Sequence, residues 1–179
     1  MMQKEPQKRK NLRLENYDYA QAGCYFVTLC VKDGHEMLGK IDAGATVPGR
    51  PQHIRINCKL SDIGKVVDSA ILHNNRNGVK VDHYVIMPNH IHMIIAIQPE
   101  AGDRGRSPLQ MIIRNLKAYV TKQIGFSIWQ KFFHDHIIRN EAEYQKIWQY
   151  IDKNSEKWQE DCYYPAKKAE LDNKGGVAL

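Results

Sequence analysis

Apolar residues occur along the chain in short extended runs and at helical spacings, and this pattern predicts most of the secondary structure. The run 24–31 (CYFVTLCV) is rich in β-branched and aromatic residues and indicates a buried strand. Two strands, 79–87 and 90–97, bracket Pro88-Asn89, where a proline that cannot donate to a β-ladder marks a turn, bulge or edge. Further strands are expected at 36–41, 53–58 and 129–139.

Three stretches carry apolar residues at three- and four-residue steps, which is the spacing of an amphipathic helix. The first begins at Ser61-Asp62 and is expected to end near Asn77-Gly78. The second has Ser107 as its cap and Pro108 at its first position, and it stops at Gly125. The third begins at Asn140, which forms a capping-box-like start with Glu143. Its inward residues are expected to be Tyr144, Ile147, Trp148 and Ile151.

The order of these elements is strand, short strands, helix, two strands, helix, strand and helix. Such an order suits an α+β, ferredoxin-like fold in which an antiparallel sheet has its helices packed on one face. The 179 residues are enough for one ordinary domain, which we place at 14–164. Residues 1–13 form a basic N-terminal tail and 165–179 a flexible C-terminal tail, because both lack apolar periodicity.

The charge balance changes the range of expected partners. Lysine and arginine total 26 against 20 acidic residues, which gives a net charge of +6 and favours a polyanionic partner without proving one. A merely soluble basic surface is the alternative. No apolar run approaches the roughly 20 residues that span a bilayer, and no signal-type stretch follows the N-terminus, so we expect no membrane association and a cytoplasmic location.

The sharpest chemical signal is the sequence His90-Ile91-His92. On a strand, residues i and i+2 face the same way, so both imidazoles point together while Ile91 faces the opposite, buried side. Two imidazoles on one pleat can hold a metal ion; alternatively, they merely cover a half-solvated sheet. A second such triplet, His134-Asp135-His136, has a charged central residue and is expected to be structural or to contact substrate.

Two histidines leave the coordination shell of a divalent ion incomplete, and a catalytic ion also keeps positions open for substrate. Further ligands must therefore come from elsewhere in the chain. The candidates are Asn154 on the last helix, Gln123 on the middle helix, and Asp82 or His83 just upstream.

Three segments, in this order, carry a resemblance to a known family. They are 23–28 (GCYFVT), 84–92 (YVIMPNHIH), and 129–154, in which Trp129-Gln130 leads through 135–139 (DHIIR) to 150–154 (YIDKN). Together they resemble the single-tyrosine HUH transposases, including the REP-associated tyrosine transposases and the small insertion-sequence transposases, over about residues 13–164.

The resemblance implies a metal-dependent endonuclease and strand transferase that nicks single-stranded DNA through a 5′-phosphotyrosine intermediate. It implies that Tyr150 is the nucleophile and that His90, His92 and Asn154 hold Mg²⁺ or Mn²⁺. A four-residue step places Tyr150 and Asn154 on one helical face. Tyr119 and Gln123 have the same spacing on the middle helix, but Tyr119 stacks over Ile112, which favours a position at the edge of the core.

The resemblance also implies a single-stranded or hairpin DNA substrate. Basic residues that could meet its phosphates are Arg13, Arg104, Arg106, Arg114, Lys117 and the run Lys8-Arg9-Lys10. Both a homodimer and a monomer are compatible with the family. Two other functions stay open: a domesticated hairpin or single-stranded DNA-binding protein without cleavage activity, and a metal hydrolase of small phosphoesters.

Overall fold

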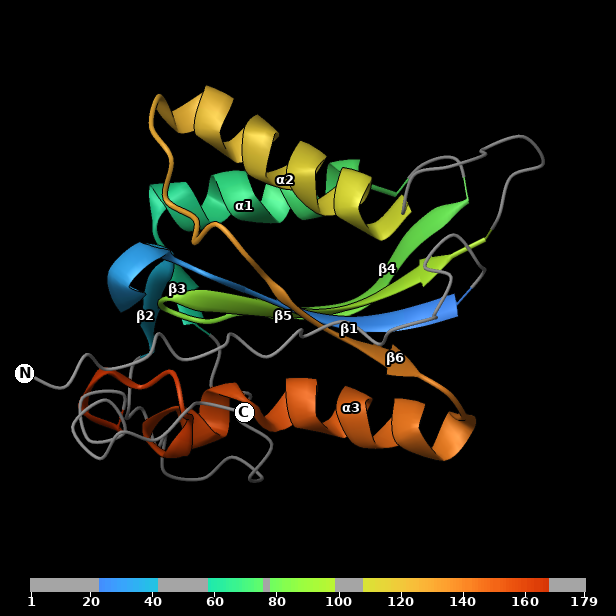
Figure 1. Ribbon diagram of the computed structural model, residues 1–179. Coiled ribbons are helices and arrows are strands. Elements are labelled where there is room, and N and C mark those ends of the chain that lie inside the picture. The colour runs from blue at the N-terminus through green and yellow to red at the C-terminus, as the bar shows by residue number, and fades with distance from the viewer. Residues whose placement is uncertain (1–22, 42–57, 76–77, 99–107, 168–179) are drawn as a thin grey trace, which may run out of the picture.

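The core of the protein is a four-stranded antiparallel sheet with helices on both faces (Figure 1). The computed structural model describes residues 23–41, 58–75, 78–98 and 108–167. The strand order is β4-β5-β1-β6, and a separate two-stranded sheet pairs β2 with β3. The strands are β1 (Gly23–Cys30), β2 (Gly39–Ile41), β3 (Cys58–Leu60), β4 (Val79–Ile86), β5 (His90–Ile97) and β6 (His134–Ile138).

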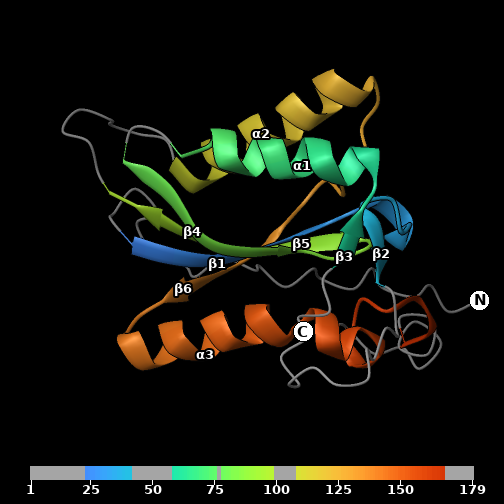
Figure 2. The same ribbon diagram turned by 180° about the vertical axis from the view of Figure 1, so that it is seen from behind.

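The helices divide unequally between the two faces of the sheet, as Figures 1 and 2 show from opposite sides. Helices α1 (Asp62–His73) and α2 (Pro108–Ile124) cover one face, and α3 (Glu141–Lys153) covers the other. The α+β class, the antiparallel sheet and the ferredoxin-like order of elements are confirmed. The expectation that all helices share one face is wrong for α3.

Apolar residues on both sides of the central strands explain why both faces of the sheet are covered. In β5, Ile91, Met93 and Ile95 belong to the main core, whereas Ile94 points to the opposite face and packs with Ile151 of α3. A strand buried on both faces requires a packing partner on each side. The third helix supplies the second partner.

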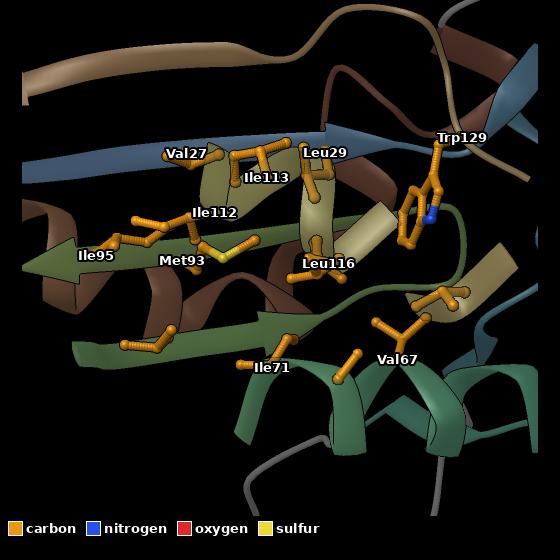
Figure 3. Packing of buried hydrophobic residues seen from close by; sticks show 14 of the residues in the cluster. Val27, Leu29, Val67, Ile71, Met93, Ile95, Ile112, Ile113, Leu116 and Trp129 are labelled. Carbon is orange, nitrogen blue, oxygen red and sulfur yellow. The ribbon is translucent and has the colours of Figure 1, made fainter. Parts of the chain in front are cut away.

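The main core lies between the sheet and the helix pair α1 and α2 (Figure 3). Side chains from alternate positions of β1 and β5 point toward both helices there. The residues labelled in the figure are Val27, Leu29, Val67, Ile71, Met93, Ile95, Ile112, Ile113, Leu116 and Trp129.

Helix α3 is fixed by its cap and by its inward stripe, both as predicted. The Asn140 side chain accepts a hydrogen bond from the Glu143 amide at 2.9 Å, which satisfies one of the free N–H groups of the first turn. The inward residues Tyr144, Ile147, Trp148 and Ile151 pack in the smaller apolar cluster with Ile94 and Ile138. The short 3-10 segment η2 (Ser155–Glu160) follows directly.

Strand β6 is shorter than the predicted 129–139. Its regular pairing begins only at His134, and Trp129 makes a single bridge to Val31. The Lys117 ammonium donates to the carbonyl of Gln130 at 2.8 Å and lies 3.4 Å from the carbonyls of the next two residues, so these groups point to a lysine rather than to a neighbouring strand. The segment keeps one backbone bond to β1, from the Gln130 amide to the Cys30 carbonyl at 3.0 Å.

Other element boundaries differ from the predicted ones by a few residues. Helix α1 ends at His73 instead of near residue 77, and Asn75, beyond its end, accepts a hydrogen bond from the Val81 amide of β4. The predicted strand 36–41 contracts to β2, and 53–57 lies outside the described residues, as does Ser107, the expected cap of α2.

The predicted tails fall almost entirely outside the described residues: none of 1–13 is described, and of 165–179 only 165–167. Within the part of the chain that the structure describes, no helix has both the length and the apolar character needed to cross a bilayer.

Candidate active site

His90 and His92 lie side by side on the face of β5 that α3 covers. They pair with Cys30 and Thr28 of β1, and strand alternation turns Ile91 to the main core, as expected. The two histidines are 0% and 2% exposed, so they do not cover a half-solvated sheet. Their Nε2 atoms are 3.0 Å apart.

The orientation of both rings is set through their Nδ1 atoms. His90 Nδ1 contacts Asn89 Oδ1 at 2.9 Å, and His92 Nδ1 contacts Thr28 Oγ1 at 2.8 Å. Because Asn89 donates its amide hydrogens to the carbonyls of Gly34 and Tyr163, its Oδ1 must accept from His90 Nδ1. His90 Nε2 is then unprotonated, and its lone pair faces His92. A histidine that binds a metal is typically held in this way, with its other ring nitrogen donating a hydrogen bond.

Asn154 and Asp161 complete the wall of this site. Asn154, at the C-terminal end of α3, is 3% exposed and donates from Nδ2 to Asp161 Oδ2 at 3.1 Å. Asp161 follows η2, accepts from the Tyr163 amide through Oδ1 at 2.7 Å, and places Oδ2 3.9 Å from His90 Nε2. The donor atoms of His90, His92 and Asp161 all lie within 4.8 Å of one another.

The charges and lone pairs of this group fit a cation. Burial lowers the pKa of His92 to about 3, and burial, followed by the proximity of a second ionisable ring in His92, lowers the pKa of His90 well below its usual value, so both imidazoles are neutral. Among the described residues, the one basic group within 4.0 Å of the buried Asp161 carboxylate is His90, which is neutral and therefore leaves the negative charge without a counterion.

A buried oxygen without a hydrogen-bond partner is a second indication of a cation site. Asn154 Oδ1 is buried and has no hydrogen-bond partner among the described residues. Amide oxygen, carboxylate and imidazole are all ligands of divalent ions, and two cis ligands with bonds of about 2.1 Å lie about 3 Å apart, which matches the Nε2 separation. The residues present therefore fit a divalent metal ion.

Tyr150 reaches this group from α3 of the same chain. Its Oη lies 3.2 Å from His92 Nε2, and its ring packs edge-on against Phe26 with centroids 5.9 Å apart. The side chain is partly exposed to solvent, since 45% of the surface of Tyr150 is accessible. Burial and the negative charge of Asp161 raise the pKa of Tyr150, whereas a hydrogen bond with Asn154 lowers it.

The rival pair lies elsewhere. Tyr119 and Gln123 belong to α2, on the other face of the sheet, and the Tyr119 ring stacks on His73 with centroids 5.8 Å apart at the edge of the main core. This is the core-edge position expected for Tyr119.

Two other candidate ligands are also engaged away from the histidine pair. Asp82 pairs with Lys80 at 2.7 Å. His83 stacks on Trp148 with ring centroids 3.9 Å apart, and its Nε2 lies 2.9 Å from the Asp152 carboxylate. Of the four residues considered for the incomplete shell, the structure brings Asn154 to the histidines.

The second histidine triplet lies on β6, two strands away from β5. His134 pairs with Thr28 in the register, and His136 Nε2 lies 2.6 Å from the Glu143 carboxylate of α3. Among the described residues, neither histidine belongs to the group of donors that could hold a metal ion. The His136 contact ties β6 to α3, which is a structural role.

The predicted DNA contacts are only partly described. Arg13, Arg104 and Arg106 lie outside the described residues, as does the run 8–10. Arg114 is exposed, and Lys117 directs its ammonium to backbone carbonyls. Both residues belong to α2, which covers the face of the sheet opposite the two histidines.

Asp161 is the site residue that sequence reasoning missed. It lies seven residues beyond Asn154 in a segment without helical or strand periodicity, so spacing gives no signal for it. Only the turn of η2 at the end of α3 returns the chain to the histidines, where Tyr163 also packs on the His90 ring with centroids 4.6 Å apart.

Comparisons with known proteins agree with this architecture. No family model matches the sequence. A protein of Haemophilus influenzae (strain ATCC 51907 / DSM 11121 / KW20 / Rd), named only as uncharacterized, is 31% identical over 87% of this chain and 93% of its own length. A solved structure of a REP-associated tyrosine transposase bound to a REP hairpin superposes with a TM-score of 0.55 at 23% identity, over 81% of this chain and 73% of the other. The chain thus belongs to the same family as the Haemophilus influenzae protein and has the fold of a REP-associated tyrosine transposase.

Proposed function

We propose that this protein is a transposase-type enzyme that nicks and rejoins single-stranded DNA, with Tyr150 as nucleophile. The observation that carries the proposal is the 3.2 Å approach of Tyr150 Oη to His92 Nε2, beside a buried set of metal donors in the same chain. The hairpin in the solved structure with this fold supports DNA as the substrate class. A hairpin with an unpaired flank is the substrate we favour.

The donors proposed to hold Mg²⁺ or Mn²⁺ are His90, His92, Asn154 through Oδ1, and Asp161. A divalent cation there would neutralise charge on a nonbridging phosphate oxygen, and this charge otherwise repels an attacking nucleophile. Thr28 and Asn89 hold the two rings in place through Nδ1. Asp161 holds the Asn154 amide so that Oδ1, not Nδ2, is the free atom.

Tyr150 performs the covalent step. Its Oη attacks the phosphorus, the new O–P bond forms, and the bond from phosphorus to the 3′-oxygen breaks. The phenol proton ends on the released 3′-hydroxyl, by way of solvent that reaches this partly exposed side chain. The product is a 5′-phosphotyrosine, and a second 3′-hydroxyl reverses the step and joins new ends without ATP because the ester conserves the bond energy.

The nucleophile and the donors come from one chain, so the proposed reaction works in cis. Phe26 and His92 pack against the Tyr150 ring and limit its rotation, which keeps Oη near the donors. No exchange of α3 between subunits is required for this arrangement.

The test is mass spectrometry of tryptic peptides after incubation with labelled single-stranded and hairpin DNA and Mn²⁺. We expect a DNA adduct on the peptide that contains Tyr150, its loss in Tyr150→Phe, and its retention in Tyr119→Phe. An adduct at Tyr119 would move the nucleophile to α2. DNA binding without any adduct would favour the non-cleaving binding protein, and turnover of a soluble phosphodiester without a protein-linked product would favour the hydrolase.

A further inference from the structure

A cleft lined by lysines opens beside Tyr150. It has a volume of about 430 Å³ and lies along the second half of α3 and η2. Its walls include the reaction-site residues Tyr150, Asn154 and Asp161 together with Lys146, Lys153 and Lys157. A ligand that fills this cleft therefore lies beside both the proposed nucleophile and the three lysines.

The spacing of the lysines along α3 follows that of the tyrosine. Lys146 precedes Tyr150 by four residues and Lys153 follows it by three, so the three side chains are neighbours on one helical face, about 5–6 Å apart between successive Cβ atoms. Lys157 extends the row into η2. The lysines thus bracket the phenol along the cleft.

Among the described residues, these ammonium groups have no carboxylate partner. In the described part of the chain no carboxylate lies within 4.0 Å of Lys146, Lys153 or Lys157, and all three residues are exposed. Glu160 is the one other acidic residue besides Asp161 along the cleft. Lys117 differs, because its ammonium donates to backbone carbonyls. The charges of the three cleft lysines are, by contrast, available to a ligand.

We propose that Lys146, Lys153 and Lys157 bind the phosphates that flank the scissile phosphate in an unpaired DNA strand lying along α3. The inference rests on the proposed function, because Tyr150 defines the scissile position. The volume is that of a small-ligand site, and a nucleotide-sized segment of a flexible strand fits it. Contacts of this kind position the backbone and do not read the base sequence.

The test measures how DNA affinity depends on salt in a Tyr150→Phe background, which cannot form the ester. The probe is a short fluorescent oligonucleotide without self-complementarity. Its binding is measured by fluorescence anisotropy at constant Mg²⁺. For single strands the slope of log affinity against log salt is about −0.7 per phosphate contact. We expect Lys146→Gln/Lys153→Gln to make the slope shallower by about 1.4 and to weaken binding.

The matched control is Lys65→Gln/Lys122→Gln, which removes the same charge from α1 and α2 on the far side of the sheet. It should change the slope by much less. Equal changes in the two double variants would overturn the proposal, and so would an unchanged slope in the cleft variant. The absence of a tyrosine adduct in the wild-type protein would instead refute the proposed function and leave the salt result to be judged separately.

Discussion

Acid should destabilise the metal-free protein through its buried histidines. Burial lowers the pKa of His92 to about 3, whereas an unfolded chain has a histidine pKa near 6.5. Between these values the unfolded chain binds a proton that the folded protein does not, so the free energy of unfolding falls as the pH falls, by about 1.4 kcal/mol per pH unit from His92. From pH 6.5 to 5 this amounts to about 2 kcal/mol, a large part of a domain's stability of about 5–15 kcal/mol.

The assay is urea denaturation at pH 7 and pH 5 with a chelator present. Substitution of His92→Gln should shrink the difference between the two pH values by about 2 kcal/mol, because the group that takes up the proton on unfolding is gone. His35→Gln, at an exposed histidine, is the control and should leave the difference intact. If His92→Gln fails to fold, an NMR titration of the wild-type protein replaces it. Protonation of the His92 ring near pH 6.5 would refute the reasoning.

Three further outcomes follow from named contacts. Asp161→Asn removes the one buried charge of the donor set and should weaken Mn²⁺ binding by at least about tenfold in calorimetry; unchanged affinity would remove Asp161 from the site. Ile151→Ala leaves a cavity between α3 and the sheet and should cost about 2–5 kcal/mol in urea denaturation, and a loss under about 1 kcal/mol would contradict the packing. Gly64→Ala should lower the Tm although alanine favours helices by about 1 kcal/mol, because the added Cβ overlaps the Leu38 carbonyl oxygen; a higher Tm would refute this.

Local patterns were enough to predict the elements themselves. The strand predicted at 90–97, directly after Pro88-Asn89, coincides with β5, and the cap at Asn140 with its apolar stripe predicted α3. The ferredoxin-like order follows from the succession of these elements. The position of α3 was not predictable from its own stripe, since an amphipathic helix packs equally well on either apolar face of a sheet, and the outcome depended on Ile94 pointing away from the main core.

The same division holds for the candidate site. The sequence by itself determined that His90 and His92 point together and that Tyr150 and Asn154 share one helical face, because strand and helix periodicities act over a few residues. Only the tertiary structure decided that the two pairs meet and that Asp161 joins them. The reason is that the packing of α3 on the sheet brings Tyr150 Oη to 3.2 Å from His92 Nε2. No local periodicity encodes a contact between residues so far apart in the sequence.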